Sequence, residues 1–586
     1  MQNIKTFIRM YKQLLQILNS KQKRQAVIVA LFAIVSALLE TLGVSVIIPF
    51  ILMMLQPEQL MNNHYVKVIL ETLGITEVYH VLLITALMII VIYVLKNAFI
   101  LWFNFVQLNF RNRLERDLSI LMLRSYIYKP YSFFLNVNSA EIMRGITGDI
   151  AGVATVVDSF CNLFNEGITC LLIGAVLVVM NPYLAICLLL LAGFAALIMV
   201  VGLRKRISEC GVECRQAFAK RYQHAYQAVN GIKEISVMKR QDNFLQYFDE
   251  ASQTACRYNT KYLWVAKLPS RVIETIFISG LIVLVLVSMK TVDNTVMLVA
   301  QFGTLAMASV RILPSISNIA NAMNALIYQR PALESAYENI VGQKLQIQQI
   351  ETDKANKSER KAEFNNSITV DHIQWRYEKS LPDVLKDLCM EIKPGEAIGL
   401  IGESGAGKTT LVDIILGLFE PQEGTIKVDD KNIFDINTGW HKLIGYVPQN
   451  VFLIDDTVRN NILFGIDEKE VDDARVWRAI EQAQLKEFVE KLPQGLDTIL
   501  GERGVKISGG QRQRIAIARA LYYDPEVLVL DEATSALDNE TESAIMEAIN
   551  MLQGQKTLII VAHRLTTIER CDKVFEIVQG QAVQKK

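Results

Sequence analysis

The sequence lacks several features that would assign it to common classes of protein. Lysine and arginine together number 60, and aspartate and glutamate together also number 60. The chain therefore has no excess of positive charge that would indicate a nucleic-acid partner. The eight cysteines form no C-x-x-C pair and show no zinc-type spacing. Cys210 and Cys214 could share a helical face, but no histidines accompany them. We therefore expect reduced, structural thiols and no cysteine-bound metal.

A cleavable signal peptide is also not expected. The first apolar stretch begins near Gln25 and continues to about Leu55. The apolar core of a signal peptide has only about 7–15 residues. This stretch is therefore interpreted as the first membrane helix.

Apolar and charged residues are abundant, but they lie in different halves of the 586-residue chain. Hydrophobic residues make up 51% of the sequence and charged residues 20%. Residues 25–325 hold repeated apolar runs, whereas residues 326–586 have the mixed pattern of a soluble α/β protein. We expect a transmembrane domain with cytoplasmic helical extensions at 1–330, a polar linker at 331–365 and a soluble domain at 366–586.

Six apolar segments are long enough to cross a membrane as helices, because a hydrocarbon core of about 30 Å needs about 20 residues. They are 26–55, 80–106, 158–180, 183–203, 268–289 and 295–318. Lysine and arginine are concentrated before the first segment, between the second and third, and after the fourth, whereas the opposite loops hold only Lys67 and Lys290. The positive-inside rule then places both termini in the cytoplasm.

The two cytoplasmic connections, 107–157 and 204–267, are long and mostly helical in pattern. We expect them to continue the membrane helices and to turn at Lys129–Tyr131 and around Gln241–Asp242. Projections of this kind could reach the soluble domain. The first outer loop, 56–79, is predicted to contain a small amphipathic helix.

The soluble half contains a glycine-rich segment, Gly402-Glu-Ser-Gly-Ala-Gly407-Lys408-Thr409, between an apolar strand-like run and a helical run. Glycines let the backbone wrap a phosphate chain, and the following helix directs N–H groups at the anion. Lys408 would reach the β- and γ-phosphates, and Thr409 would bind Mg²⁺. The segment therefore predicts binding of ATP with Mg²⁺.

A second segment, Val527-Leu-Val-Leu-Asp531-Glu532, is an apolar run that ends in two carboxylates. A buried strand here would deliver Asp531 to the Mg²⁺. Glu532 follows directly and could polarise the attacking water. The pair thus predicts ATP hydrolysis.

The third segment is Ile507-Ser508-Gly509-Gly510-Gln511, followed by a basic helical stretch. It resembles the LSGGQ signature of ABC transporters, with isoleucine in place of leucine. Ser508 and the glycine N–H groups at a helix start suit a γ-phosphate. In this order, the segments resemble an ABC nucleotide-binding domain over the whole soluble half.

The resemblance implies further roles in the ATP site. Tyr377 would stack on adenine, Gln449 would sense Mg²⁺ and water, Asp538 would be the D-loop residue, and His563 would hold the γ-phosphate. Glu502 would lie in a loop that touches the membrane half. The predicted nucleotide-binding set is completed by Gly402, Glu403, Ser404, Gly405, Ala406, Gly407, Thr410, Gly509, Gly510 and Gln511.

The six-helix domain fused ahead of the ATPase domain is similar to the ABC exporter arrangement. In that family the P-loop and the signature lie on opposite faces of the domain, so a second copy would have to supply Ser508. Because Glu532 is present, we expect a homodimer with two working sites, the alternative being a heterodimer with a degenerate partner. The resemblance implies a multi-pass protein of the bacterial inner membrane that works by alternating access.

Charged residues in membrane helices are costly and usually mark function. The three candidates for an anionic substrate are Lys96, Arg271 and Arg311, all in the cytoplasmic halves of their helices. The alternative is that they snorkel or pair with acidic residues, with Glu274 one turn from Arg271. Glu40 and Glu166 are further potential counter-ions.

The chain resembles bacterial flippases of lipid-linked oligosaccharides. The resemblance lies in the membrane half and in three segments of the soluble half, Leu411-Val-Asp-Ile-Ile-Leu-Gly-Leu, Ile444-Gly-Tyr-Val-Pro-Gln-Asn and Leu492-Pro-Gln-Gly. Such a flippase would hold a pyrophosphate with basic residues while a polyprenyl tail stays in the lipid.

Two other functions remain open: a multidrug, lipid or peptide exporter, and an ATP-gated channel or regulatory subunit. A peptide exporter with a built-in protease is disfavoured, since no domain with a Cys/His pair precedes the first helix. Glu532 and His563 argue against a channel, because a gate that need not cycle rapidly can lose them.

Overall fold

The computed structural model describes residues 2–55, 78–180, 182–291, 295–342, 362–501, 504–532, 539–562 and 568–586. The chain divides into two compact units. The first comprises Met1–Lys129 and Asn136–Ile350, and the second comprises Pro130–Leu135 and Glu351–Lys586.

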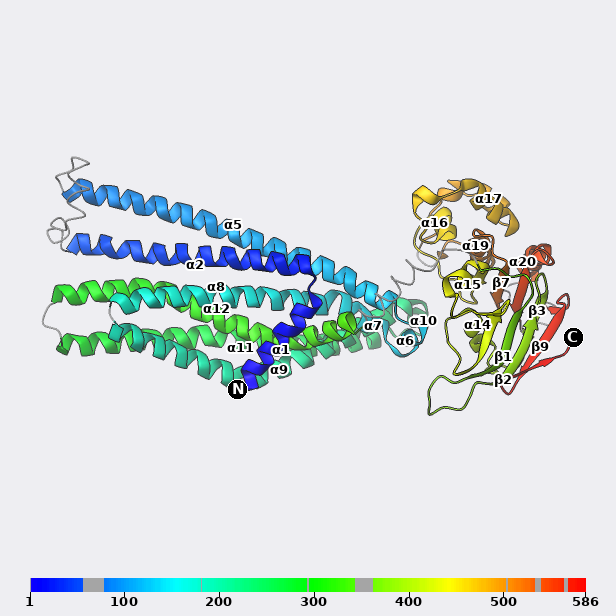
Figure 1. Ribbon diagram of the computed structural model, residues 1–586, viewed down its shortest axis with the longest axis horizontal. Coiled ribbons are helices and arrows are strands. Elements are labelled where there is room, and N and C mark those ends of the chain that lie inside the picture. Colours follow the sequence, from blue (N-terminus) through cyan, green and yellow to red (C-terminus); the bar gives the residue numbers. More distant parts are fainter. Residues whose placement is uncertain are drawn as a thin grey trace. The chain divides into compact units, whose positions relative to one another are not determined.

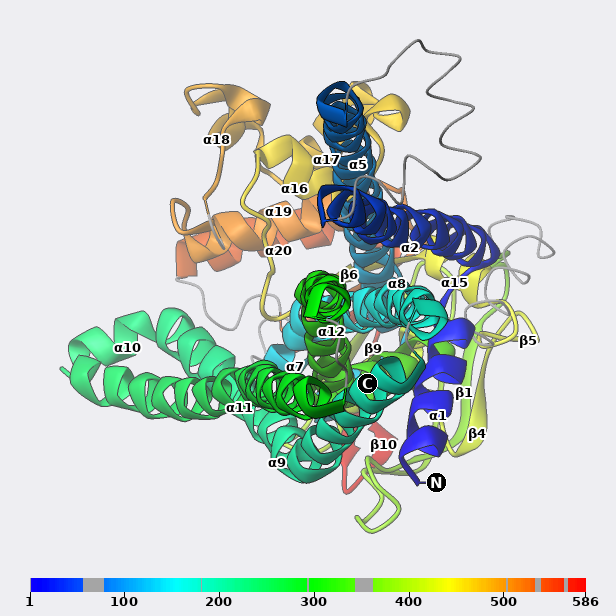
Figure 2. The ribbon, with the colours of Figure 1, turned by 90° about the vertical axis from the view of Figure 1, so that its left-hand side faces the viewer.

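The described part of the first unit consists of helices joined by short turns. Six long helices lie side by side in it (Figures 1 and 2). They are α2 (Ser20–Leu55), α5 (Val78–Ile127), α8 (Ile150–Met180), α9 (Pro182–Asn230), α11 (Gln241–Thr291) and α12 (Thr295–Val341). The shorter elements are α1 (Gln2–Ile17), α7 (Ser139–Arg144), a π-helical turn (Gly145–Asp149) and α10 (Ile232–Val237). The closest packing is between α9 and α11, α8 and α12, and α2 and α5.

The six predicted membrane segments all lie inside these six helices. Among the residues that the structure describes, three stretches are long and apolar enough to cross a membrane: Ser20–Ile47, Tyr79–Ile127 and Ser139–Val179. The small helix predicted for 56–79 falls outside the described residues, apart from the start of α5.

Both predicted turns of the helical extensions are confirmed. Helix α5 ends at Ile127 and the short helix α6 (Tyr131–Asn136) begins after Pro130, which disfavours helical geometry in the residue before it. Helix α10 ends at Val237 and α11 begins at Gln241. Helix α8 ends at Met180 and α9 opens with Pro182, a residue suited to the first turn of a helix.

The predicted end of the membrane half at residue 330 falls inside α12, which continues through Pro331 to Val341. Residues 343–361 lie outside the described part, so the linker boundary stays a prediction. Pro130–Leu135 groups with the second unit, where the Tyr131 ring lies 5.6 Å from that of Phe419.

The second unit is built on a six-stranded sheet of order β10-β9-β3-β8-β7-β6. Its strands are β3 (Ala397–Ile401), β6 (Ile444–Val447), β7 (Val527–Asp531), β8 (Thr557–Val561), β9 (Lys573–Val578) and β10 (Gln581–Gln584). All neighbouring pairs are parallel except β9 with β10. The predicted parallel α/β core is therefore confirmed.

The sequence did not predict a second sheet, which is antiparallel and has the order β2-β1-β4-β5. Its strands are β1 (Ile368–Trp375), β2 (Leu385–Ile392), β4 (Glu423–Val428) and β5 (Lys431–Asn432). One feature of the sequence could have predicted the antiparallel pairing: no helical stretch lies between β1 and β2. Parallel neighbours need a crossover connection, which is usually a helix, whereas antiparallel neighbours do not.

The helices described after β3 are α14 (Lys408–Ile415), α15 (Asn437–Leu443), α16 (Val458–Leu463), α17 (Asp473–Gln482), α18 (Lys486–Glu490), α19 (Gly509–Leu521) and α20 (Asn539–Leu552), with 3₁₀ turns at Glu468–Glu470 and Gly495–Asp497. Helices α14, α15 and α19 pack against strands of the six-stranded sheet, whereas α16 and α17 pack against α19. Side chains of β7 alternate between two apolar clusters, Leu528 and Leu530 on one face and Val527 and Val529 on the other. Burial on both faces explains the unbroken apolar runs in the sequence.

Candidate functional site

The glycine-rich segment connects the end of β3 to the start of α14. Gly402, Gly405 and Gly407 have φ values of 147°, 82° and 106°. These conformations are strained for residues with a side chain. A Cβ on Gly407 would also lie 2.9 Å from a methyl group of Leu385. The glycines therefore make the tight loop possible, and the loop ends at the N-terminus of α14, where free N–H groups favour an anion.

Lys408 is the first residue of α14, and its side chain folds back over this loop. Its Nζ donates to the carbonyl oxygens of Gly402 at 2.8 Å and Glu403 at 3.0 Å, and the residue is only 5% exposed. The ammonium group is thus held inside the loop that would surround a phosphate chain. Thr409, the next residue, is exposed, so its side chain is accessible to a ligand.

Tyr377 lies next to the first turn of α14. Its hydroxyl group is 3.1 Å from that of Thr410, and its ring stands edge-on to Trp375 at 4.4 Å. Tyr377 is 48% exposed, so ring surface remains for a flat ligand. This placement fits the stacking role implied by the resemblance. Ser404, Gly405 and Ala406 form the exposed to half-exposed crest of the loop.

The two carboxylates follow β7 as predicted. Asp531 is 5% exposed, and burial raises its pKa, with the neighbouring Glu532 acting in the same direction and Lys408 opposing. Glu532 has a φ of 44° and its N–H donates to the carbonyl oxygen of Val561 on β8. Strands β3, β8 and β7 are adjacent and parallel, so their carboxyl ends bring the glycine-rich loop and the carboxylates to one edge of the sheet.

Gln449 follows β6, the strand next to β7, and its Nε2 donates to Oε2 of Glu532 at 2.5 Å. This bond holds the carboxylate that sequence reasoning assigned to the attacking water. Sequence reasoning missed Gln513 on α19, which is 6% exposed and donates to the carbonyl oxygen of Pro448. It connects the signature helix to the residue before Gln449.

Asp413 is a second residue that sequence reasoning missed. It lies in α14, and burial together with the nearby Asp531 raises its pKa to about 6. A cation bound here would relieve the cost of holding the buried Asp531 and the partly buried Asp413 carboxylates close together. The donor set of Thr409, Asp531 and Gln449 thus fits a Mg²⁺ ion, and the loop with Lys408 fits its phosphates.

Ser508 caps the N-terminus of α19. Its Oγ accepts from the N–H of Gln511 at 3.2 Å, and the side chain of Gln511 accepts in return from the N–H of Ser508 at 2.9 Å. The signature sequence therefore builds a capping box, with Gly509 and Gly510 in the first turn. The helix packs against α16, α17 and β6. Ser508 is exposed, so a phosphate can reach this helix end.

Three residues named by the resemblance, Asp538, His563 and Glu502, fall outside the described part of the chain. Their roles stay predictions.

The three basic candidates in the membrane helices have separate local partners. Arg311 of α12 forms an ion pair with Glu40 of α2, which is 6% exposed. Arg271 of α11 pairs with Glu274 at 2.9 Å, and its side chain is 81% exposed. These pairs correspond to the alternative considered from the sequence, in which the basic residues pair with acidic residues of the membrane helices.

Lys96 of α5 lies against α2. Its Nζ is 4.4 Å from the centre of the Tyr93 ring, and the Tyr93 hydroxyl donates to the carbonyl oxygen of Gly43 at 3.1 Å. Glu166 of α8, the remaining acidic candidate, accepts a hydrogen bond from Asn318 at 2.8 Å.

Comparison with known proteins places this geometry in a family. Residues 385–535 match the family model described as ABC transporter, and residues 26–313 match the model described as ABC transporter transmembrane region. The chain is similar to an ATP-dependent lipid A-core flippase of Nitrosococcus oceani, with 30% identity over 81% of this chain and 78% of that protein. It is also similar to the heterocyst differentiation ATP-binding protein HepA of Nostoc sp., with 33% identity over 82% of this chain and 76% of that protein.

A solved structure of a bacterial Atm1-family ABC exporter with ATP bound has the same fold. Its TM-score is 0.74 at 22% identity, covering 97% of this chain and 96% of that one. The helical membrane domain and the α/β nucleotide-binding domain therefore follow the exporter plan. The chain belongs to the ABC transporters, as an exporter whose nucleotide-binding domain binds and hydrolyses ATP to drive transport across a membrane.

Proposed function

We propose that this exporter flips a lipid-linked oligosaccharide, a polyprenyl pyrophosphate glycan, from the cytoplasmic to the outer leaflet of a bacterial inner membrane. The observation that carries the proposal is the likeness over about four fifths of the chain to a protein named as a lipid A-core flippase. That name supports a lipid as cargo. The oligosaccharide and the pyrophosphate rest on the resemblance of the membrane half and on the basic residues of its helices.

In the ATP site, the loop from Gly402 to Gly407 and the N-terminus of α14 hold the phosphates, and Lys408 carries the compensating charge. Thr409, Asp531 and Gln449 would hold Mg²⁺, which when bound neutralises charge on the phosphates. Glu532 accepts a proton from the attacking water, and the hydrogen bond from Gln449 holds its carboxylate in place. His563 would contact the γ-phosphate.

One chain supplies one glycine-rich loop and one signature. We propose a homodimer in which Ser508 and Asp538 of a second copy complete each ATP site. Both termini and the ATPase domain lie in the cytoplasm. The exposed position of Ser508 at the start of α19 supports this arrangement, because the N-terminus of a helix favours an anion.

The membrane unit contains features suited to both ends of such a lipid. A cavity of about 630 Å³ is lined mainly by apolar side chains of α1, α2 and α8, and among its described lining residues Lys23 alone is charged. Hydrocarbon fits this lining. Arg271 has the more accessible charge of the two paired arginines, whereas a headgroup at Arg311 would compete with Glu40. We therefore expect Arg271 and Lys96 to contribute more to headgroup binding than Arg311.

The test uses purified protein in proteoliposomes containing fluorescent polyprenyl pyrophosphate oligosaccharide, with a fluorescent phospholipid in parallel vesicles. ATP should cause loss of glycan accessibility on one side with wild type. Glu532→Gln should bind ATP but lose hydrolysis by about 10²–10⁴-fold, as for removal of a general base, and should not flip.

Variants of the membrane unit test the headgroup site. The triple alanine variant at Lys96, Arg271 and Arg311 should lose flipping and keep basal ATPase activity. Full flipping by that variant would refute the anion site. ATPase activity without flipping of any lipid would refute the flippase and leave an exporter of drugs or peptides.

The homodimer is tested with the same preparation. A single purified gene product that hydrolyses ATP, and whose activity falls on mixing with Ser508→Arg chains, supports two shared sites. Hydrolysis that appears only after addition of a second gene product would point to the heterodimer.

A further inference from the structure

Strands β1 and β2 contain two opposed irregularities. The register passes from Val370↔Met390 to Ile373↔Leu388 and then to Trp375↔Leu385. One extra residue therefore lies on β1 in the first interval and one on β2 in the second, so each strand is bulged once. The second bulge compensates the register shift of the first, and the ladder is regular from Ile368↔Ile392 to Val370↔Met390.

The bulges place unusual residues opposite each other. His372 on β1 and Asp387 on β2 have φ values of 51° and 53°, in the left-handed region. The alternation of buried side chains shifts at the same points, so His372 and Asp387 are both exposed. Conformations of this kind are costly for residues other than glycine, and they are found at functional sites more often than elsewhere.

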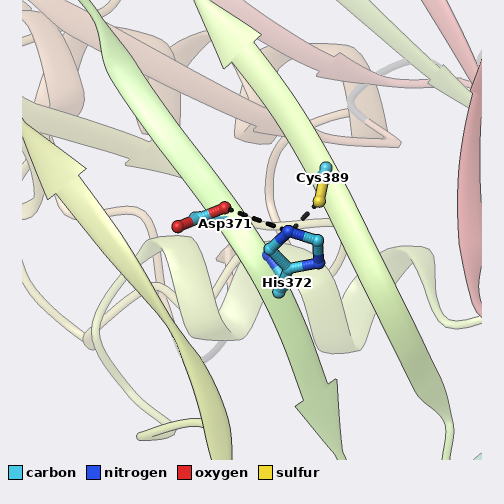
Figure 3. Close-up of side chains that lie close together, drawn as sticks. All are labelled: Asp371, His372 and Cys389. Carbon is cyan, nitrogen blue, oxygen red and sulfur yellow. Dashed lines mark hydrogen bonds and ion pairs between the residues drawn. The ribbon is translucent and has the colours of Figure 1, made fainter.

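Four chemically active side chains meet at this point. Asp371, His372 and Cys389 present one ligand atom each within 4.8 Å of one another (Figure 3). Nε2 of His372 is 3.7 Å from Oδ1 of Asp371. The Sγ of Cys389 accepts a hydrogen bond from the backbone N–H of His372 at 3.3 Å. Nδ1 of His372 is hydrogen-bonded to the carboxylate of Asp387.

The separation of 3.7 Å between Nε2 of His372 and Oδ1 of Asp371 is close to that around a tetrahedral Zn²⁺ ion, and the three ligand atoms all lie within 4.8 Å of one another. Bonds of about 2.0–2.1 Å to nitrogen or oxygen and about 2.3 Å to sulfur separate the ligand atoms by about 3.3–3.6 Å. The observed separations need only a small closing movement of exposed side chains. A thiolate, an imidazole and a carboxylate together favour zinc over magnesium or calcium, which prefer oxygen ligands alone.

The hydrogen bond between His372 and Asp387 resembles the one that orients the ring of a metal-binding histidine. When Nδ1 donates its proton to a carboxylate, the lone pair is left on Nε2, and metal-binding histidines are commonly held in this way. Here Nε2 is the atom that faces Asp371. Asp387 therefore belongs outside the ligand set, as the residue that orients the ring.

We propose that Asp371, His372 and Cys389 form a binding site for one Zn²⁺ ion per chain on the exposed surface of the β1–β2 ladder, with Asp387 as the positioning residue and a water molecule as fourth ligand. The site lies outside the ATP machinery and does not depend on the transported substrate. Bound metal would join the two bulged strands and stabilise the antiparallel sheet.

The test measures metal binding by the full-length protein in detergent after removal of metals with a chelator, without nucleotide. Zn²⁺ should bind with one equivalent per chain that is absent in Cys389→Ser and in His372→Ala. Co²⁺ should give a thiolate charge-transfer band in the wild type only. Cys256→Ser is the matched control, because Cys256 is also exposed and should not affect either signal.

Two further readouts distinguish a metal site from a structural hydrogen-bond network. Zn²⁺ should protect Cys389 from alkylation while Cys256 stays reactive, as measured by mass spectrometry of digested protein. Asp387→Asn should weaken Zn²⁺ affinity by about 10–100-fold without abolishing binding. Unchanged ATPase activity of the variants shows that they are folded.

Two results would overturn the proposal: zinc stoichiometry unaffected by Cys389→Ser, or alkylation of Cys389 at the same rate with and without Zn²⁺. In either case the four side chains form only an exposed network of hydrogen bonds.

Discussion

Replacing Asp149 with asparagine should strongly destabilise the first unit. Asp149 ends the π-helical turn before α8, and its side chain is 3% exposed. Its two carboxylate oxygens accept hydrogen bonds from Nε and Nη2 of Arg215 on α9, at 2.9 and 2.7 Å. The pair thus connects the turn before α8 to α9.

The magnitude follows from the burial of the two partners. Removing one member of a buried ion pair costs about 3–5 kcal/mol, because the other charge is left without compensation. The side chain of Arg215 is 26% exposed, so water can partly hydrate it in the variant. We therefore expect a loss near the lower end, about 3 kcal/mol.

The same region offers a matched control. Asp117 on α5 pairs with Arg116 at 2.8 Å, but these side chains are 39% and 72% exposed. Exposed pairs contribute about 0–1 kcal/mol. Asp117→Asn should therefore have little effect on stability.

The assay is thermal unfolding of the protein in lipid nanodiscs, followed by a fluorescent reagent that labels cysteines as they become exposed. Cys210 and Cys214 are both 1% exposed, and Cys214 lines the same pocket as Asp149. Equal shifts for Asp149→Asn and Asp117→Asn would refute the argument from burial. Partial recovery in Asp149→Leu with Arg215→Met would support it, since the double replacement removes the uncompensated charge of Arg215. Recovery should stay partial because Arg144, whose Nε lies 3.9 Å from the Asp149 carboxylate, keeps its charge.

Three further predictions concern the second unit. Gly407→Ala should weaken ATP binding through backbone strain of roughly 1–2 kcal/mol and a clash with Leu385 of β2. The control is Gly465→Ala, which is also at positive φ but in open space and should bind ATP normally in a nucleotide-fluorescence titration. Trp440→Phe should lower the stability of this unit to urea by about 1–3 kcal/mol, because it removes the hydrogen bond at 2.9 Å to the buried carbonyl group of Ile415; an unchanged midpoint would contradict this. Burial, with a contribution from an adjacent carboxylate, raises the pKa of Cys571 to about 11, so the folded state favours the neutral thiol and stability should fall as the pH rises from about 9 to 11. Cys571→Ala should remove that part of the alkaline loss, as measured by unfolding midpoints at pH 8 and pH 10.

The ATP site shows how far local sequence can predict a site. The loop ending in Lys408 and the strand ending in Asp531 are each fixed by a short segment, since glycine content, an apolar run and a helix start are local properties. Their meeting at one edge of the sheet follows from the parallel order of β3, β8 and β7. The supporting contacts of Gln513 and Asp413 could not be read from the sequence, because each depends on a neighbour more than 60 residues away.

In the membrane half, the sequence predicted the helices but not the contacts between their charged side chains. Hydrophobic length located all six helices, because the bilayer sets a minimum span. It could not decide between an anion site and internal pairing for Arg311 and Arg271. The contact of Arg311 with Glu40 depends on how α12 packs against α2, and hydropathy does not specify helix rotation.

The sequence by itself thus determined the two-part architecture, the spans, the parallel core and the ATP chemistry, since each is written in periodicity or in a contiguous motif. Only the tertiary structure decided which distant side chains meet. Cysteine spacing gave no indication of a metal site, yet the bulges of β1 and β2 bring Cys389 to His372 and Asp371. The physical reason is that strand register, with its one-residue irregularities, is set by pairing across the sheet and not by either strand alone.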